Sequence, residues 1–379
     1  MKSDSEDAVV FMQRALDLAR QGQYSARPNP CVGCVIVNDN KIVGEGTHWQ
    51  AGQAHAEVEA CLQAETRARG ATAYVTLEPC VHLGRTGPCV DVLRKAGIKH
   101  VVMAMLDPNP LVAGKGLEAL ERAGMSVSLG VLAEQAQALN KGFISRMTHA
   151  RPYVRAKIAM SLDGRIALKN GESQWITGEA ARESGHYWRA RSGAVITGAQ
   201  TVLADNCKMT VRLPALPLPP SVSFRAPLRV IVDGQGRVPA TAAILSQPGQ
   251  AVVATVSEIS GADINAQVIR LPEKNGHVDL NSLLAWLAER EINDVLLESG
   301  AGLTSAFYQE NLIDELLLYI APVFLGPDAR AMIHFPELTH LAQASRGSLD
   351  KIQRLGEDLH TILAVSDFAK QWRTEHEQY

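Results

Sequence analysis

Short apolar runs alternate with helix-like stretches along most of the chain, and this alternation constrains the fold more than any other feature. In the N-terminal third, strand-like runs at 32–37, 41–45, 73–77, 100–104 and 126–129 are separated by helical patterns at 7–22, 55–69, 90–96 and 116–123. Strands that alternate with helices are typical of layered α/β folds. A length of 379 residues exceeds one ordinary core, so we expect two such domains.

A second alternation follows residues 142–152, which show little apolar periodicity and are predicted to be a linker. We therefore expect domains at 1–147 and 152–370. Predicted strands of the second half lie at 154–159, 194–197, 229–232, 251–256, 294–298, 315–321 and 361–365, with helices near 178–191, 281–290 and 303–310. The segment 213–226, which holds four prolines, is predicted to be a surface loop.

Composition excludes several classes of protein. A net charge of -3 and the lack of a long Lys/Arg block argue against a nucleic-acid partner. No apolar run approaches the ~18 residues that a membrane span needs. The polar, acidic N-terminus (Met1 to Asp7) lacks the pattern of a secretion signal. Six cysteines, five of them before residue 90, indicate metal chemistry in a reducing cytoplasm rather than a disulfide framework.

The metal chemistry is suggested by His55-Ala56-Glu57, followed by Pro79-Cys80 and Cys89. One histidine and two cysteines are ligands suited to zinc, and a catalytic zinc keeps its fourth position open for a water whose pKa falls to ~7. Glu57 would then be the acid/base that shuttles protons. This set is typical of zinc deaminases that act on nucleobases.

Alternative interpretations of these residues remain. Cys31-Val-Gly-Cys34 could join Cys80 and Cys89 in a four-cysteine structural zinc site, although His55 and Glu57 would then be unexplained. Deaminases of polynucleotides and free nucleosides usually show Pro-Cys-x-x-Cys, whereas eight residues separate Cys80 from Cys89 here. His48 and Trp49 are predicted to be surface residues. Lys115, in a short Gly-Lys pair, is a weak candidate for steering a phosphate.

A second constellation follows the predicted strand at 294–298, where Gly300-x-Gly302-x-x-Ser305 leads into an apolar helix. Glycines at such a turn let the backbone approach a phosphate at a helix N-terminus. The third glycine of a dinucleotide fingerprint is replaced by Ser305, and no acidic residue follows at the usual spacing. The pattern is therefore compatible with a phosphate-cradling turn or with small residues that serve packing alone.

Five motifs in the first half resemble the RibD family of bifunctional riboflavin-biosynthesis deaminase/reductases. They are Pro28-Asn29-Pro30-x-Val32-Gly33-Cys34, His55-Ala56-Glu57, Thr76-Leu77-Glu78-Pro79-Cys80, Gly84-Arg85-Thr86-x-Pro88-Cys89 and Asp107-Pro108-Asn109-Pro110. The resemblance implies a cytidine-deaminase-like α/β/α domain that deaminates 2,5-diamino-6-ribosylamino-pyrimidinone 5'-phosphate. It implies that His55, Cys80 and Cys89 bind zinc and that Glu57 is the proton shuttle. Asn29 would bind the substrate, with His82 and Arg85 lining its entry.

The resemblance continues through Lys157-x-x-x-Ser161-Leu162-Asp163-Gly164-Arg165, Gly171 to Thr177 and Thr201 to Asp205. It implies a domain similar to dihydrofolate reductase that uses NADPH to reduce the ribosyl group to a ribityl chain. Lys157 would orient the substrate or assist proton transfer. The residues implied to contact NADPH are Ala159, Trp175, Thr201, Asp205, Gly300, Ala301, Gly302, Leu303, Thr304, Ser305 and Ala306. The residues implied to contact the substrate are Ser173, Arg189, Met209, Arg212 and Glu298.

The chain departs from the family pattern at two places. The family reads Ala-Asp-Asp-Pro where this chain has Ala204-Asp205-Asn206-Cys207, and Glu-x-Gly-Pro where it has Glu298-Ser299-Gly300-Ala301. Cys207 is therefore expected to be a loop thiol. Both departures bear on how the cofactor is held, and neither touches the residues implied for the deaminase.

Three functions follow from these patterns. The first is a two-step enzyme, with zinc-dependent deamination and then NADPH-dependent reduction of a small phosphorylated pyrimidine. The second keeps the deaminase but makes the C-terminal half a nucleotide-binding regulatory module. The third is a nucleic-acid deaminase, against which the charge and the cysteine spacing argue. The family resemblance also implies self-association through the reductase half.

Overall fold

The computed structural model describes residues 6–81, 87–110, 112–258, 265–335 and 337–371. The chain forms two compact units, one of Met1–Ala150 with Leu216–Arg225, the other of Arg151–Ala215 with Ala226–Tyr379. Both units are mixed α/β, which confirms the predicted fold class. The proline-rich segment 213–226 has no helix or strand and is largely exposed, as predicted for a loop. Among the described residues, no helix has the length and apolar character needed to cross a membrane.

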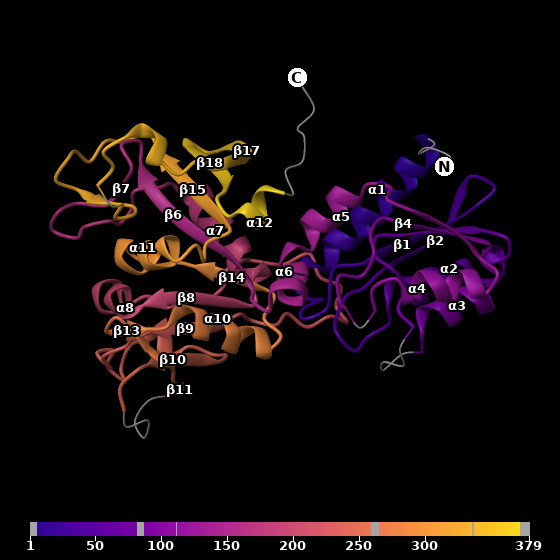
Figure 1. Cartoon of the computed structure of the whole chain (residues 1–379), viewed down its shortest axis with the longest axis horizontal. Helices are drawn as coiled ribbons and strands as arrows, with labels where there is room; N and C mark the ends of the chain where they lie inside the picture. Colours follow the sequence, from indigo (N-terminus) through magenta and orange to yellow (C-terminus); the bar gives the residue numbers. More distant parts are fainter. Residues whose placement is uncertain (1–5, 82–86, 111, 259–264, 336, 372–379) are drawn as a thin grey trace. The chain divides into compact units, whose positions relative to one another are not determined.

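The first unit is an α/β/α sandwich around a five-stranded sheet of order β2-β1-β3-β4-β5 (Figure 1). The antiparallel hairpin of β1 and β2 stands beside three parallel strands. The strands are β1 (Gly33–Asn38), β2 (Lys41–Thr47), β3 (Thr72–Val75), β4 (His100–Met103) and β5 (Ser126–Leu129). The helices are α1 (Glu6–Gln21), α2 (Ala56–Ala64), α3 (Cys89–Ala96), α4 (Lys115–Arg122), α5 (Ala133–Leu139) and α6 (Lys141–His149), with 3-10 turns at Gly22–Tyr24 and Glu65–Ala68.

Glycines in the hairpin bring α1 and α2 into direct contact with opposite faces of this sheet. A Cβ on Gly33 would lie 2.0 Å from the carbonyl oxygen of Ala15 in α1, and one on Gly46 would lie 2.0 Å from that of Ala56 in α2. Gly33 and Gly46 are neighbours in the register, since Gly33 pairs with Thr47 and Gly46 with Cys34, so they face opposite sides. The first turn of α2 is thereby held against the sheet.

The prediction of a linker at 142–152 is wrong for most of that range, because α6 occupies Lys141–His149. Phe143 and Ile144 are buried on this short helix. Two adjacent apolar residues cannot produce a visible helical period, which explains why the pattern resembled a linker. The helix depends instead on tertiary burial of its first turn. Only 150–152 separate α6 from the first strand of the second unit.

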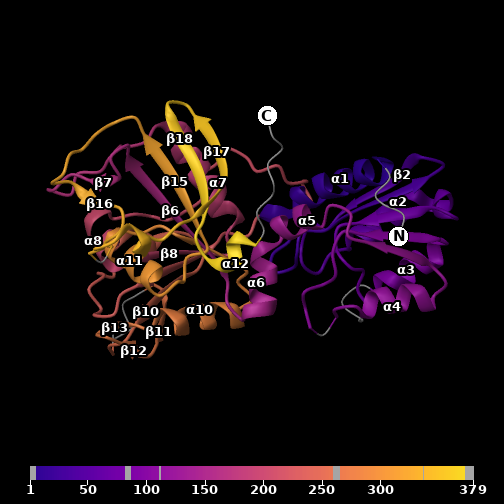
Figure 2. The ribbon, with the colours of Figure 1, turned by 45° about the horizontal axis from the view of Figure 1, so that its top comes forward.

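The second unit is built on a nine-stranded sheet of order β11-β10-β9-β8-β14-β6-β15-β18-β17. Strands from β11 to β15 run parallel, and β18 and β17 add an antiparallel edge (Figure 2). The strands of this sheet are β6 (Tyr153–Ser161), β8 (Ala194–Gly198), β9 (Leu228–Val232), β10 (Ala251–Thr255), β11 (Gln267–Arg270), β14 (Asp294–Leu297), β15 (Glu315–Ala321), β17 (Ser348–Leu355) and β18 (Asp358–Ala364).

Helices cover both faces of the large sheet and enclose two apolar clusters. They are α7 (Glu179–Arg191), α8 (Ala199–Asp205), α9 (Ala243–Ser246), α10 (Leu280–Glu289), α11 (Ala301–Gln309) and α12 (Asp367–Lys370), with a 3-10 turn at Leu341–Gln343. Two small ladders pair β7 (Arg165–Ala167) with β16 (Arg330–Ala331) and β12 (Glu273–Lys274) with β13 (His277–Val278). Leu283 and Phe307 fill one cluster, whereas Val195 and Tyr319 fill the other. The carboxyl ends of β8, β14 and β6 form one edge, where ligands of open α/β sheets usually bind.

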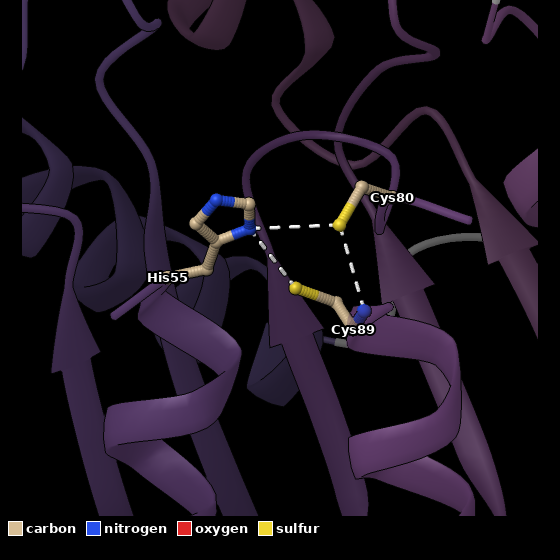
Figure 3. A group of neighbouring side chains, drawn as sticks. All are labelled: His55, Cys80 and Cys89. Atoms are coloured by element: carbon tan, nitrogen blue, oxygen red, sulfur yellow. Dashed lines mark hydrogen bonds between the residues drawn. The ribbon is translucent and has the colours of Figure 1, made fainter. Parts of the chain in front are cut away.

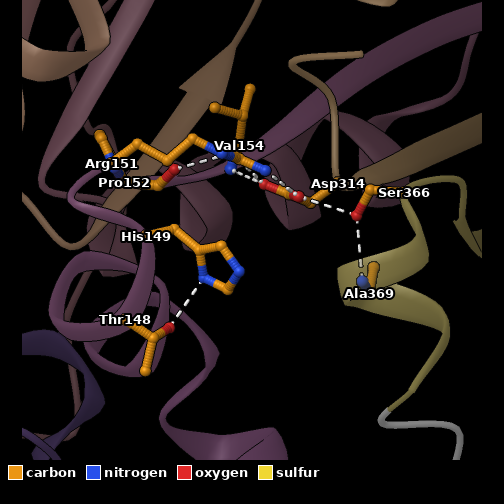
Figure 4. A network of polar contacts seen from close by, with 8 residues as sticks. All are labelled: Thr148, His149, Arg151, Pro152, Val154, Asp314, Ser366 and Ala369. Carbon is orange, nitrogen blue, oxygen red and sulfur yellow. Dashed lines mark hydrogen bonds and ion pairs between the residues drawn. The ribbon is translucent and has the colours of Figure 1, made fainter. Parts of the chain in front are cut away.

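The opposite end of the sheet is held by Asp314, just before β15. Its carboxylate accepts hydrogen bonds from Arg151 at 2.7 and 2.8 Å, from the Val154 amide at 2.8 Å and from the Ser366 hydroxyl at 2.8 Å (Figure 4). The Ser366 oxygen in turn accepts the Ala369 amide and caps α12. One buried carboxylate therefore joins the starts of β6 and β15 to the C-terminal helix.

Candidate functional site

The zinc ligands implied by the sequence lie together in the first unit. The ligand atoms of His55, Cys80 and Cys89 are all within 4.8 Å of one another. The His55 Nδ1 is 3.2 Å from the Cys89 sulfur and 3.5 Å from the Cys80 sulfur, and the ring edge faces both thiols (Figure 3). One imidazole and two thiols converging on one point are a donor set that fits zinc with an open fourth position.

Secondary structure delivers each of these side chains. His55 is the residue before α2, Cys80 follows β3, and Cys89 is the first residue of α3. The starts of α2 and α3 therefore meet beside the carboxyl end of β3. The positive ends of two helix dipoles favour anionic ligands such as thiolates.

The two thiols differ in their affinity for protons. Hydrogen bonding from Cys89, together with the neighbouring His55, lowers the pKa of Cys80 to about 4 against the opposing effect of burial. The pKa of Cys89 is raised, because Cys89 makes that hydrogen bond and is buried. Cys80 is therefore the thiol of the pair that ionises more readily, and the thiolate is the form that ligates zinc.

Glu57 is two residues beyond His55 in the first turn of α2, and its side chain is buried. Burial, reinforced by the charge of Cys80, raises the pKa of Glu57 to about 7. A carboxyl group that titrates near neutral pH can both accept and donate a proton. It is not one of the three grouped ligands.

The prediction that His48 is a surface residue is wrong. Its ring is buried, lies 5.1 Å from the His55 ring centroid, and has Nε2 3.0 Å from the side-chain nitrogen of Asn29. Burial lowers the pKa of His48, so the ring is neutral near pH 7. The sequence predicts a strand at 41–45 with His48 near the turn that follows, whereas in the structure the His48 amide donates to the Val32 carbonyl at 2.9 Å and continues the β1–β2 pairing past Thr47. Trp49 is half-buried.

The four-cysteine alternative is not supported. Cys34 is buried in β1 and burial raises its pKa well above the ordinary value, so it is a protonated core thiol. The main chain of Cys31 is held by the Asn140 carboxamide, with bonds of 2.8 and 3.0 Å. Neither belongs to a metal-ligand group within the part of the chain that the structure describes. The implied entry residues His82 and Arg85 lie outside the described residues.

In the second unit, Lys157, Arg189 and Glu298 form a charged cluster beneath the carboxyl edge of the sheet. Arg189 donates to both carboxylate oxygens of Glu298, at 2.5 and 2.9 Å, and to the Thr210 carbonyl at 2.9 Å. Burial alone would raise the pKa of Glu298, but the Arg189 guanidinium holds it below its ordinary value. Burial lowers the pKa of Lys157, and the nearby Glu298 opposes that effect.

The implied cofactor turn also lies at this edge. Gly300 caps α11, and its amide donates to the Thr201 hydroxyl of α8 at 3.1 Å. A Cβ on Gly302 would meet nothing within 4 Å, so the backbone there is open to a ligand. Ser305 donates to the Ala301 carbonyl and accepts the His334 amide, which gives it a structural role. Leu303, Thr304 and Ala306 complete the first turns of α11.

The departures from the family pattern have local explanations. Asn206 ends α8 with a φ of 43°, a left-handed conformation that asparagine tolerates well, and its side chain accepts the Ala243 amide at 2.8 Å. Ala301 is the first residue of α11, a position where proline and alanine both fit a helix.

The other implied contacts are more dispersed. Ala159 lies on β6, two residues beyond Lys157, and Asp205 is exposed at the end of α8. Trp175 is exposed, with Arg182 4.8 Å from its ring centroid. Met209 is buried in the core cluster below the sheet edge, so its main chain is the part available to a substrate. Ser173 is half-buried and Arg212 is exposed.

The sequence analysis did not identify three residues that lie near the charged cluster: Ser184, His186 and Tyr319. His186 accepts the Arg212 amide at 3.3 Å, and its pKa is lowered to about 4 by burial and by the charges of Arg189 and Arg212. Tyr319 places its ring 5.5 Å from the Lys157 ammonium and its hydroxyl 2.9 Å from that of Ser184. His186 precedes Arg189 by one helical turn, which is the spacing that could have identified it.

Comparisons with known proteins agree with both halves. Residues 152–361 match the model of the RibD C-terminal domain, and residues 5–105 match the cytidine and deoxycytidylate deaminase zinc-binding region. The chain is 46% identical over 360 residues to the riboflavin biosynthesis protein RibD of Escherichia coli, covering 93% of this chain and 98% of that protein.

Two solved structures are similar over nearly the whole chain. RibD from Acinetobacter baumannii, form 1, is 47% identical with a TM-score of 0.88, covering 96% of this chain and 99% of that one. A diaminohydroxyphosphoribosylaminopyrimidine deaminase/5-amino-6-(5-phosphoribosylamino)uracil reductase from Thermotoga maritima is 33% identical with a TM-score of 0.84, covering 95% and 99%.

Proposed function

The chain belongs to the RibD family, and on that premise we propose that it catalyses two consecutive steps of riboflavin biosynthesis. The N-terminal half is a zinc-dependent deaminase of 2,5-diamino-6-ribosylamino-pyrimidinone 5'-phosphate. The C-terminal half is an NADPH-dependent reductase that converts the ribosyl group of the deaminated product to a ribityl chain. The observation that carries the proposal is the convergence of His55, Cys80 and Cys89 beside the buried Glu57, in a chain whose residues 152–361 match the RibD C-terminal domain.

Zinc would supply a Lewis acid that activates water, and NADPH would supply the hydride. His55, Cys80 and Cys89 would hold the metal. Glu57, in the same first turn of α2 as the metal ligand, takes a proton from the attacking water and delivers it to the departing amine. Asn29 orients the pyrimidine with a carboxamide that can donate and accept hydrogen bonds, and His48 fixes that carboxamide from behind. Ammonia leaves as the carbonyl forms.

In the reductase half, Lys157 is placed to handle the proton that must accompany hydride transfer to the ribosyl carbon. Burial disfavours its charged form, whereas Glu298 favours it, so the ammonium can lose and regain a proton more readily than an exposed lysine. Glu298, held by Arg189, is positioned to bind ribose hydroxyls. The exposed Arg212 would be the cation that pairs with the substrate phosphate, since guanidinium groups pair with phosphate bidentately. Arg189 donates to Glu298 and to the Thr210 carbonyl, so it would contribute its charge to the same site and not a bidentate contact.

The cofactor would bind across the carboxyl ends of β8, β14 and β6. Gly300 to Ala306 would cradle its phosphates at the start of α11, with Thr201 bracing the turn from α8. Ala159, Trp175 and Asp205 would make the remaining contacts, and Ser173 and Met209 would contact the substrate. The open space at Gly302 supports a close approach of the cofactor to the backbone.

Broader properties follow the same reasoning. We place the deaminase domain at 1–147 and the reductase domain at 152–370. The six cysteines all carry free thiols, which supports a cytoplasmic location. Self-association through the reductase half and the absence of a nucleic-acid partner complete the proposal.

The test couples both steps in one assay. Purified, zinc-loaded protein is given the diaminopyrimidinone ribosyl phosphate, and the near-ultraviolet absorbance of NADPH is followed beside ammonia release. We expect both signals in the wild type. Glu57→Ala should retain zinc and lose both signals, while keeping NADPH oxidation when the deaminated product is added directly. Ammonia release that survives in Glu57→Ala would remove Glu57 from its role.

NADPH oxidation distinguishes the proposed reductase from the alternative in which the C-terminal half is a regulatory module. NADPH binding without any oxidation, in the presence of deaminated product, would discard the reductase assignment and leave the deaminase intact. A shift of labelled RNA that depends on salt would instead revive a nucleic-acid substrate.

A further inference from the structure

Glu78 is a buried carboxylate that the proposed chemistry does not use, although it stands two residues before the ligand Cys80. Its side chain is 3% exposed. Both of its oxygens are occupied by backbone amides. Oε2 accepts from Asp107 and Gly114, each at 3.0 Å, whereas Oε1 accepts from Gly116 at 2.6 Å and from Leu117 at 3.1 Å.

These four bonds define what Glu78 can do. A carboxylate has about four lone-pair positions, and four N–H donors fill them. The side chain therefore has no lone pair left to ligate a metal. Among the described residues, the hydrogen-bond partners of the Glu78 side chain are these four main-chain amides. Removing one buried acceptor from such a set leaves several donors unsatisfied.

All four donors lie between Asp107 and Leu117, after β4 and in the first turn of α4; Leu111, within this segment, is outside the described residues. The first amides of a helix have no acceptor within the helix itself, and the N-cap residue of α4, Gly114, offers no side chain to accept from them. Glu78 replaces that cap from the segment that follows β3. A Cβ on Gly116 would lie 2.3 Å from the Pro79 carbonyl oxygen, so the main chains of the two segments are in direct contact.

The location ties this contact to the zinc site. β3 and β4 are neighbouring parallel strands, so the segments after them emerge at the same edge of the sheet. The Glu78 amide donates to the Met105 carbonyl at 3.0 Å, which continues that pairing past the strand ends. One segment delivers Cys80. The other carries Asn109 and the cation Lys115, which suit a polar, phosphorylated substrate.

We propose that Glu78 is a positioning residue of the deaminase, whose carboxylate holds the Asp107–Leu117 segment against the Cys80 segment so that it forms one wall of the substrate site. This inference rests on the proposed deaminase function. It assigns Glu78 to substrate binding and leaves metal binding to His55, Cys80 and Cys89.

The test is Glu78→Gln in the full chain. Glutamine keeps one acceptor oxygen and turns an NH2 group toward two amide donors. Since a buried hydrogen bond to a charged group is worth a factor of about ten or more, kcat/KM for ammonia release should fall roughly tenfold to a hundredfold, mainly through KM. Zinc content should stay at the wild-type level. Amide exchange should accelerate in 107–117 and not in the peptide that carries His55.

Two further variants keep the result interpretable. Gly116→Ala drives the same two segments apart from the other side and should reproduce the KM increase, even where Glu78→Gln does not fold. Glu118→Gln alters an exposed carboxylate on the same helix and should behave as wild type. Turnover of the deaminated product by the reductase half reports on the integrity of the chain and should stay unchanged in all three.

Specific outcomes overturn the proposal. An unchanged KM in both Glu78→Gln and Gly116→Ala would show that the segment does not contribute to the substrate site. Loss of zinc in parallel with activity would make Glu78 a support for the Cys80 ligand alone. If the wild-type chain itself releases no ammonia, the proposed function has failed, which is a different result from either.

Discussion

The side-chain nitrogen of Asn29 lies 3.0 Å from Nε2 of His48, and Nδ1 of the same ring lies 3.0 Å from the Ala54 carbonyl oxygen. An amide nitrogen can only donate, and a carbonyl can only accept, so Nε2 is the acceptor and Nδ1 carries the proton. The neutral ring of His48 thus bridges the Pro28-Asn29-Pro30 segment and the residue that precedes His55. This bridge fixes Asn29 relative to the metal ligands.

Replacing His48 with phenylalanine should separate substrate binding from metal binding. The variant keeps a ring beside His55 but removes the acceptor for Asn29, and an unsatisfied buried donor costs ~1–3 kcal/mol. We expect kcat/KM for ammonia release to fall by about tenfold or more, with zinc retained. Steady-state kinetics and metal analysis measure the two effects. His277→Phe, at an exposed position, is the matched control, and a zinc-free His48→Phe would contradict the expectation.

Gly46→Ala should damage the zinc site through the backbone. Its Cβ would lie 2.0 Å from the Ala56 carbonyl oxygen, so α2 must shift at the turn that presents His55 and Glu57. Overpacking of this kind costs ~1–3 kcal/mol, and here it also displaces a ligand. We expect a lower unfolding temperature and reduced zinc affinity, measured by thermal denaturation and metal competition. Gly234→Ala, whose Cβ would have contacts of 3.8 Å or more, should change neither.

The buried Arg155 should be essential to the stability of the second unit. Its guanidinium pairs with Glu315 at 2.8 Å and with Asp294 at 2.6 Å, joining the starts of β6, β15 and β14. Arg155→Leu leaves the carboxylates of Glu315 and Asp294 without their cation. We therefore expect the free energy of unfolding to fall by ~3–5 kcal/mol. Arg354→Leu removes the exposed pair with Glu357 and should cost under ~1 kcal/mol. Denaturant titration of both variants measures the two losses in the free energy of unfolding. Equal losses would contradict the idea that burial makes the Arg155 pairs more important.

His360 should make the protein less stable in mild acid. The ring is 2% exposed, stacks on Tyr319 at 4.5 Å, and has no partner for Nε2 among the described residues. Burial, with a smaller effect of Lys351, lowers the pKa of His360 to about 4. The unfolded chain then binds more protons than the folded one between ~6.5 and ~4, so stability falls as the pH drops through this window.

The contribution lost by pH 5 should be on the order of 1–2 kcal/mol. His360→Phe retains the stacking on Tyr319 and cannot be protonated, so its free energy of unfolding should vary less between pH 7 and pH 5 than that of the wild type. Denaturant titrations at the two pH values measure the difference. An equal pH dependence in both proteins would assign the acid sensitivity to other groups.

Local sequence signals predicted most of the regular structure. The run 126–129 is β5 and the run 315–321 is β15, to the residue, because Gly124 and Gly130 enclose the first run and Asp314 and Pro322 bound the second. The predicted linker failed at α6, where a helix forms with only two adjacent large apolar residues to bury. The antiparallel edge strand β17 was also missed, since its exposure alternates around a bulge that disrupts a strict two-residue period.

The sequence by itself determined the chemistry that is available. It specified two α/β units, the residue types of a zinc site at 55, 80 and 89, and the carboxylate at 57, because those signals reside in residue identity, short spacing and local periodicity. Only the tertiary structure decided which distant residues meet. His48 against Asn29, Glu78 against the segment at 107–117, and Arg189 against Glu298 are contacts between elements far apart in the chain. They depend on strand order and on close glycine contacts such as that of Gly46, which no local pattern encodes.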